Sequence, residues 1–142
     1  MAAGPLLREK RLLQGAILIA CLVPLAAGGA GMIAGVSNVP GIDPAFRINL
    51  DSHFRYLSGL LFGVGLGFLA CLPQIEQRSL AFRLLGLMVV IGGLARLTVA
   101  TAIGPPGGAH MFALIMELGV VPALLFWQWR VARNHRDFAG AR

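Results

Sequence analysis

The sequence is poor in charged residues, and this scarcity excludes most soluble folds. Asp, Glu, Lys and Arg together make up 13% of the 142 residues, whereas hydrophobic residues make up 57%. A soluble domain carries about a quarter of its residues as charged side chains. The mean hydropathy of +0.77 also suits lipid better than water. The sequence therefore predicts an integral membrane protein.

Cysteine is scarce as well, with two residues in the chain. Cys21 lies in the middle of the first apolar stretch and Cys71 at the end of the second, so different depths in a bilayer argue against a disulfide. Neither belongs to a Cys/His pattern with metal-ligand spacing, so we expect no metal site. We also expect no catalytic residues, because the sequence has no recognisable nucleophile set and no phosphate-binding loop. This favours a protein that is not an enzyme but leaves the question open.

Four stretches are apolar and long enough to cross a bilayer, which takes ~20 residues in a helix. They predict an all-α fold, an integral membrane four-helix bundle that forms a single domain over residues 1–142 with short basic tails. The short connections at 73–79 and 104–108 predict that the last three helices are sequential antiparallel neighbours. The four stretches are residues 12–36, 52–72, 80–103 and 109–129.

The positive charges gather at one end of the predicted helices. The net charge is +6, and basic residues cluster in segments 8–11, 78–83 and 130–136. Loops rich in Lys and Arg stay in the cytoplasm, so we expect both termini there. Topology and contact with anionic lipids explain these charges, and we expect no nucleic-acid partner.

Two ionisable residues lie well inside predicted spans, Arg96 in the third and Glu117 in the fourth. Arg96 is eight residues before Gly104, and Glu117 is nine residues after Gly108. At ~1.5 Å per residue, both lie at about the same depth below the turn. An uncompensated charge there would cost ~2.5–3.5 kcal/mol or more. The sequence therefore predicts a buried ion pair between Arg96 and Glu117.

Further polar residues begin the second helix, where Asp51 and Arg55 are spaced as an i,i+4 pair. We expect them to form the mouth of a polar pocket whose floor is the ion pair. Three roles remain open: a device that sets helix register, a site for an anion or head group, and a proton-carrying site. The predicted pocket consists of Asp51, His53, Arg55, Tyr56, Arg96, His110 and Glu117.

Glycines recur at helical spacing beside these polar residues. Gly59, Gly63 and Gly67 form a small-xxx-small row, and Gly92 and Gly93 lie one turn from Arg96. Such rows let helices approach closely, and we expect helix packing from all five. A groove for a lipid tail or an isoprenoid chain is the alternative for the first row.

Three segments carry a resemblance to a known family. They are D-x-x-x-R-Y-L-x-G-L-L from Asp51, G-G-L-A-R-L from Gly92, and E-L at Glu117. Over about residues 12–131 the chain resembles the bacterial four-helix membrane family catalogued as domain-of-unknown-function family 4345. The resemblance implies a multi-pass protein of the bacterial inner membrane and no reaction. In architecture the chain is also similar, more distantly, to DoxX-like membrane proteins, some of which are associated with quinone-linked redox systems.

Two functions follow as expectations. The first is an accessory, assembly or stabilising subunit that packs against a larger membrane complex in the lipid bilayer. The second is a protein whose polar pocket, in the outer half of the bundle, binds a quinone, a lipid head group or a small anion. We expect no cofactor other than such a bound lipid or quinone. A channel or transporter is a third possibility, although four spans without repeats would conduct only as an oligomer.

Overall fold

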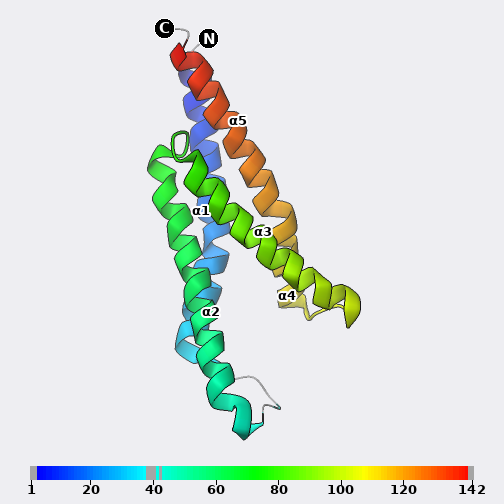
Figure 1. Cartoon of the computed structure of the whole chain (residues 1–142). Coiled ribbons are helices and arrows are strands. Elements are labelled where there is room, and N and C mark those ends of the chain that lie inside the picture. Colours follow the sequence, from blue (N-terminus) through cyan, green and yellow to red (C-terminus); the bar gives the residue numbers. More distant parts are fainter. Residues whose placement is uncertain (1–2, 38–40, 42, 141–142) are drawn as a thin grey trace. The chain divides into compact units, whose positions relative to one another are not determined.

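The computed structural model describes residues 3–37, 41 and 43–140, and this part of the chain is almost entirely helical (Figure 1). The last long helix contains a π-helical turn and continues on both sides of it. The four long helices confirm the predicted all-α fold class. The elements are α1 (Ala3–Ala34), α2 (Pro44–Cys71), a 3₁₀ turn (Leu72–Gln74), α3 (Ser79–Ala102), α4 (Gly108–Ile115), the π turn (Met116–Val120) and α5 (Val121–Gly140).

All four helices are long and apolar enough to cross a bilayer. The mean hydropathy of their most apolar parts ranges from 1.8 to 2.2. The chain is therefore a multi-pass membrane protein by helix length and composition, and the orientation of its termini stays a prediction. The candidate spans are Gly4–Ala34, Pro44–Gln74, Ser79–Ala102 and Gly108–Gly140.

The helices extend beyond the apolar stretches that predicted them. Helix α2 begins at Pro44 rather than at residue 52, because Asp43 caps it: the Ala45 N–H donates to Asp43 Oδ1 over 2.8 Å. Proline suits the first turn of a helix, where its missing N–H is not needed. Helix α5 likewise continues through the basic segment to Gly140. Hydropathy marks the part of a helix that lipid can cover, so it misses such polar ends.

The chain divides into two compact units. The first unit comprises Met1–Ala16 and Cys71–Arg142, and the second comprises Ile17–Ala70. Helix α1 contributes residues to both units, and the prediction of a single domain over residues 1–142 stays a prediction.

In the first unit, helix α3 packs along α5, and the two lie side by side in Figure 1. Phe82 of α3 and Val131 of α5 are both buried. The helices approach closely at Gly86, where an added Cβ would lie 2.5 Å from Leu125 Cδ2. A small residue facing a leucine thus sets the distance between these two helices.

In the second unit, α1 and α2 come into close contact at glycines of α1. A Cβ at Gly28 would lie 2.7 Å from the Phe62 backbone nitrogen and 2.8 Å from the Ser58 carbonyl oxygen. The predicted row on α2 has a smaller part in this contact. Gly59 is in ordinary contact with Met32, a Cβ at Gly63 would meet nothing within 4 Å among the described residues, and the role of Gly67 stays a prediction.

Candidate functional site

Arg96 of α3 contacts Glu117 in the π turn, and both belong to the first unit. Arg96 Nε donates to Glu117 Oε2 over 3.0 Å, and Arg96 Nη2 donates to Glu117 Oε1 over 3.2 Å. Two parallel bonds of this kind fix both position and orientation. The pair is only partly covered, since 34% of the Arg96 side chain and 17% of the Glu117 side chain are exposed.

The π turn that carries Glu117 has a local cause in Pro122. Proline has no N–H to donate to the carbonyl four residues earlier, and its ring clashes with that carbonyl in an α-helix. The preceding turn is wider, and the Val121 N–H donates to the Met116 carbonyl five residues back. Such turns are often found at functional sites. Pro122 is the signal in the sequence that could have revealed this turn.

The two glycines next to Arg96 have different surroundings. A Cβ at Gly93 would lie 2.8 Å from Glu117 Cβ and 2.9 Å from Leu118 Cδ2, so Gly93 lets α3 approach the π turn. A Cβ at Gly92 would meet nothing within 4 Å among the described residues. Gly92 therefore leaves open surface one turn away from the partly covered guanidinium.

Arg55 and Asp51 belong to the second unit, where they cap the end of α1. Arg55 Nη1 donates to the carbonyls of Met32 and Ile33 over 2.6 and 2.9 Å. Its Nε donates to Asp51 Oδ2 over 2.7 Å, and Asp51 Oδ1 accepts the Val36 N–H over 2.7 Å. The last carbonyls of a helix lack partners within the helix. Here a cation and a carboxylate from α2 satisfy groups at that end, so both side chains have a structural task.

Gly35 makes this cap possible. It follows the last residue of α1 with φ of +57°, a left-handed conformation that favours glycine. A Cβ at this position would collide with the Asp51 carboxylate and lie 2.8 Å from Arg55 Nε. The contacts of Asp51 and Arg55 with the end of α1 therefore require a glycine at position 35.

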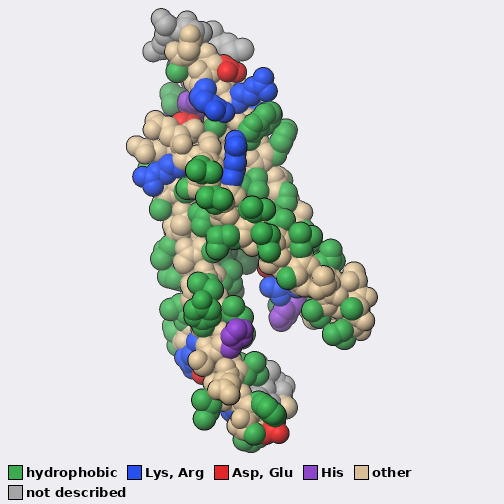
Figure 2. Space-filling model, in the orientation of Figure 1, with side chains coloured by type: hydrophobic (Ala, Val, Ile, Leu, Met, Phe, Trp, Pro, Cys, Tyr) green, Lys and Arg blue, Asp and Glu red, His purple; other side chains and the backbone are tan. Residues whose placement is uncertain are grey.

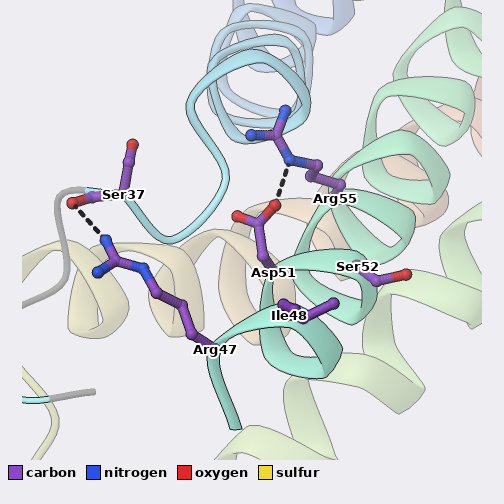
Figure 3. Close-up of a pocket in the computed structure, with 6 residues that line it drawn as sticks. All are labelled: Ser37, Arg47, Ile48, Asp51, Ser52 and Arg55. Atoms are coloured by element: carbon purple, nitrogen blue, oxygen red, sulfur yellow. Dashed lines mark hydrogen bonds and ion pairs between the residues drawn. The ribbon is translucent and has the colours of Figure 1, made fainter. Parts of the chain in front are cut away.

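Beside this cap lies an open hollow of about 570 Å³ (Figure 3). Arg55 turns toward Asp51 at one side, while Arg47 at the other side donates to the Ser37 carbonyl over 3.4 Å. Arg55 uses Nε and Nη1 for these three acceptors, and its Nη2 has no hydrogen bond among the described residues. The hollow is lined by Ser37, Arg47, Ile48, Asp51, Ser52 and Arg55.

The other predicted pocket residues are exposed. His53 and Tyr56 of α2 belong to the second unit, and His110 of α4 belongs to the first. The predicted pocket thus draws its residues from both units, with Asp51 and Arg55 in the second and Arg96 and Glu117 in the first. That these seven residues form one pocket stays a prediction.

The sequence analysis missed a group of polar contacts in the first unit. Gln128 of α5 has no exposed surface, and its Nε2 donates to the Ile75 carbonyl over 2.9 Å and to Ser79 Oγ over 2.8 Å. Nearby, Lys10 Nζ lies 2.8 Å from Glu76 Oε1. A buried amide is costly without hydrogen bonds, so a lone glutamine between Trp127 and Trp129 was the available signal.

Glu76 should make the stability of the protein depend on pH. Burial raises the pKa of its carboxyl group. The hydrogen bond from Lys10, a backbone hydrogen bond and the charges of Lys10 and His135 together outweigh burial and hold the pKa below its ordinary value of 4.5. A lowered pKa stabilises the fold above the unfolded-state value, and this contribution is lost as the pH falls through the folded-state value. We expect the melting temperature to fall as the pH is lowered below the ordinary pKa of 4.5, because the proton then binds the unfolded state more tightly than the folded state.

Glu76→Gln is the variant that tests this dependence. It should melt at a lower temperature than the wild type at pH 7 and should show a shallower decline below about pH 4.5. Asp137→Asn is the matched control, because Asp137 is well exposed and its distance to Arg133 is 3.9 Å. If the melting temperature of Glu76→Gln fell with pH as steeply as that of the wild type, the pH dependence could not be assigned to Glu76.

One comparison with known proteins identifies a family for the chain. A family model described as "Domain of unknown function (DUF4345)" matches residues 12–128, which include all seven predicted pocket residues. No curated protein and no solved structure matches the chain. The more distant resemblance to DoxX-like proteins stays a prediction. Since the model covers most of the chain, from the first candidate span to the last, this protein belongs to the DUF4345 family.

Proposed function

We propose that the protein is a small membrane protein without a recognisable catalytic set that packs, as an accessory, assembly or stabilising subunit, against a larger membrane protein complex. The observation that supports this proposal most directly is the partly covered Arg96 beside the open surface at Gly92. The basic segments at one end of the helices favour a bacterial inner membrane with both termini in the cytoplasm.

The argument begins with the donors of Arg96. A guanidinium has five N–H groups, and Nε and Nη2 of Arg96 donate to Glu117. Nη1 has no hydrogen bond within the part of the chain that the structure describes. In hydrocarbon such donors are costly, so charged groups inside spans face a protein neighbour or a water-filled cavity. A neighbouring helix with a carbonyl or carboxylate oxygen would supply the missing acceptor.

Gly92 would let that helix come near. It precedes Arg96 by four residues and so lies on the same side of α3. Small residues combined with polar side chains are typical of interfaces between membrane helices. The alternative ligand pocket at Arg55 has less support, because Arg55 already donates to Asp51 and to two carbonyls of α1.

Site-specific photo-crosslinking in native membranes tests this proposal. A photoreactive residue at Val99 lies on the same side of α3 as Gly92 and Arg96, and one at Leu94 lies on the opposite side. The two positions are matched controls, since Val99 is 53% exposed and Leu94 51%. We expect Val99 to give an adduct with a second polypeptide and Leu94 to give adducts with lipid.

A blocking variant makes the result specific. Gly92→Leu should leave the fold of the chain intact, because a Cβ there meets nothing within 4 Å among the described residues and the position is exposed, yet it should abolish the Val99 adduct. An adduct that persists in Gly92→Leu, or one that forms only within the chain, would contradict the proposal. An adduct of Val99 with a quinone would support the ligand-binding alternative instead.

A further inference from the structure

The four charged residues Arg8, Glu9, Lys10 and Arg11 on α1 have two different environments. Glu9 accepts hydrogen bonds from Arg130 of α5, and Lys10 donates to Glu76. Both partners belong to the first unit, so these two charges are neutralised within it. Arg8 and Arg11 are exposed and have no ion pair among the described residues.

Arg8 and Arg11 border a shallow hollow of about 360 Å³. They are three residues apart, so their side chains are neighbours on the helix surface. Gly4 forms part of the floor, and a Cβ there would meet nothing within 4 Å of the described residues. Leu7 and Leu12 complete the lining with exposed apolar side chains. Figure 2 shows Lys and Arg side chains gathered near the end at which both termini lie.

We propose that Arg8 and Arg11 bind the phosphate of one anionic phospholipid, whose acyl chains begin along Leu7 and Leu12. A guanidinium pairs with phosphate through two parallel hydrogen bonds, and two such groups side by side offer more donors than one phosphate requires. The hollow lies at the start of a candidate span, where head groups meet the hydrocarbon. This inference does not depend on the proposed function, because it involves another helix and another kind of partner.

The test uses the full-length protein in nanodiscs that contain dioleoylphosphatidylcholine with one fifth dioleoylphosphatidylglycerol, roughly the amount that gives a bilayer a clear negative surface potential. Native mass spectrometry after release counts the phospholipids that the protein retains. Arg8→Gln with Arg11→Gln should lower the affinity for phosphatidylglycerol by more than about thirtyfold, because the loss of the paired hydrogen bonds adds to the general effect of charge, about fivefold for each basic residue. Arg78→Gln with Arg83→Gln is the control, because it removes the same charge at two other exposed arginines.

Each outcome supports or overturns the site. A clearly greater loss of phosphatidylglycerol in the Arg8/Arg11 variant than in the Arg78/Arg83 variant supports it. Equal loss in both variants shows a general effect of charge and overturns it, as does equal retention of phosphatidylcholine by the wild type. The variant Arg8→Lys with Arg11→Lys keeps the charge and should fold, and it should show weaker but measurable retention because lysine lacks the planar fork.

Discussion

Replacing Arg96 with leucine is expected to lower the free energy of unfolding by about 1.5–3 kcal/mol, the range for hydrogen bonds to charged groups. A fully buried pair would lose about 3–5 kcal/mol, but this pair is only partly covered. The change leaves the Glu117 carboxylate, only 17% exposed, without the two hydrogen bonds that Arg96 donates. An unpaired charge inside a membrane span has no water to replace its partner. Unfolding in mixed micelles, followed by circular dichroism as the denaturing detergent is increased, would measure the loss.

The double variant with Glu117→Leu distinguishes pairing from a simple loss of packing. Removing both charges leaves two apolar side chains in an apolar setting, so much of the stability lost in either single variant should return. Losses that simply add in the double-mutant cycle would show that the pair contributes no coupling energy. Arg83→Leu on the same helix is the control, and it should change stability by less than about 0.5 kcal/mol because Arg83 is exposed.

The second large effect is expected at Gly28. Gly28→Ala should cost about 1–3 kcal/mol or more, because overpacking forces the surrounding structure to move. The new Cβ would lie 2.7 Å from the Phe62 nitrogen and 2.8 Å from the Ser58 oxygen, and both atoms are backbone. A side chain could rotate away, whereas here the second halves of the two helices must separate.

Gly63→Ala on α2 is the matched control for this prediction. A Cβ at Gly63 meets nothing within 4 Å among the described residues, so alanine should be neutral or should stabilise the helix by about 0.5–1 kcal/mol. The same detergent titration would compare both variants. Equal behaviour of Gly28→Ala and Gly63→Ala would show that the contact of α1 with α2 does not require glycine.

The sequence predicted the helices well because one physical requirement, the thickness of a bilayer, sets their apolar length. It also placed Arg96 and Glu117 at equal depth, since both positions are counted from one short turn between two neighbouring helices. Both predictions depend only on distance along the chain. That is the information a single sequence carries most directly.

Contacts between distant segments could not be predicted in the same way. The sequence analysis assigned Arg55 to the mouth of a pocket, which stays a prediction, but it did not foresee that Arg55 donates to carbonyls 22 and 23 residues earlier in the chain. Gly28 lies in the same kind of apolar sequence as the other glycines of α1. A larger residue is excluded there because the backbone of α2 at Ser58 and Phe62 lies so close. Gln128 is another such residue, because its acceptors Ile75 and Ser79 lie about fifty residues away.

The wide turn at Met116–Val120 gives the last helix a choice of register. A π turn takes up one more residue than an α-helix following the same path, and each residue of an α-helix advances by about 100°. If that extra residue were taken up one position earlier or later, Glu117 would swing to another side of the helix while both helix ends stayed in place. Slippage of this kind would make or break the contact with Arg96 without any change in the length of the helix.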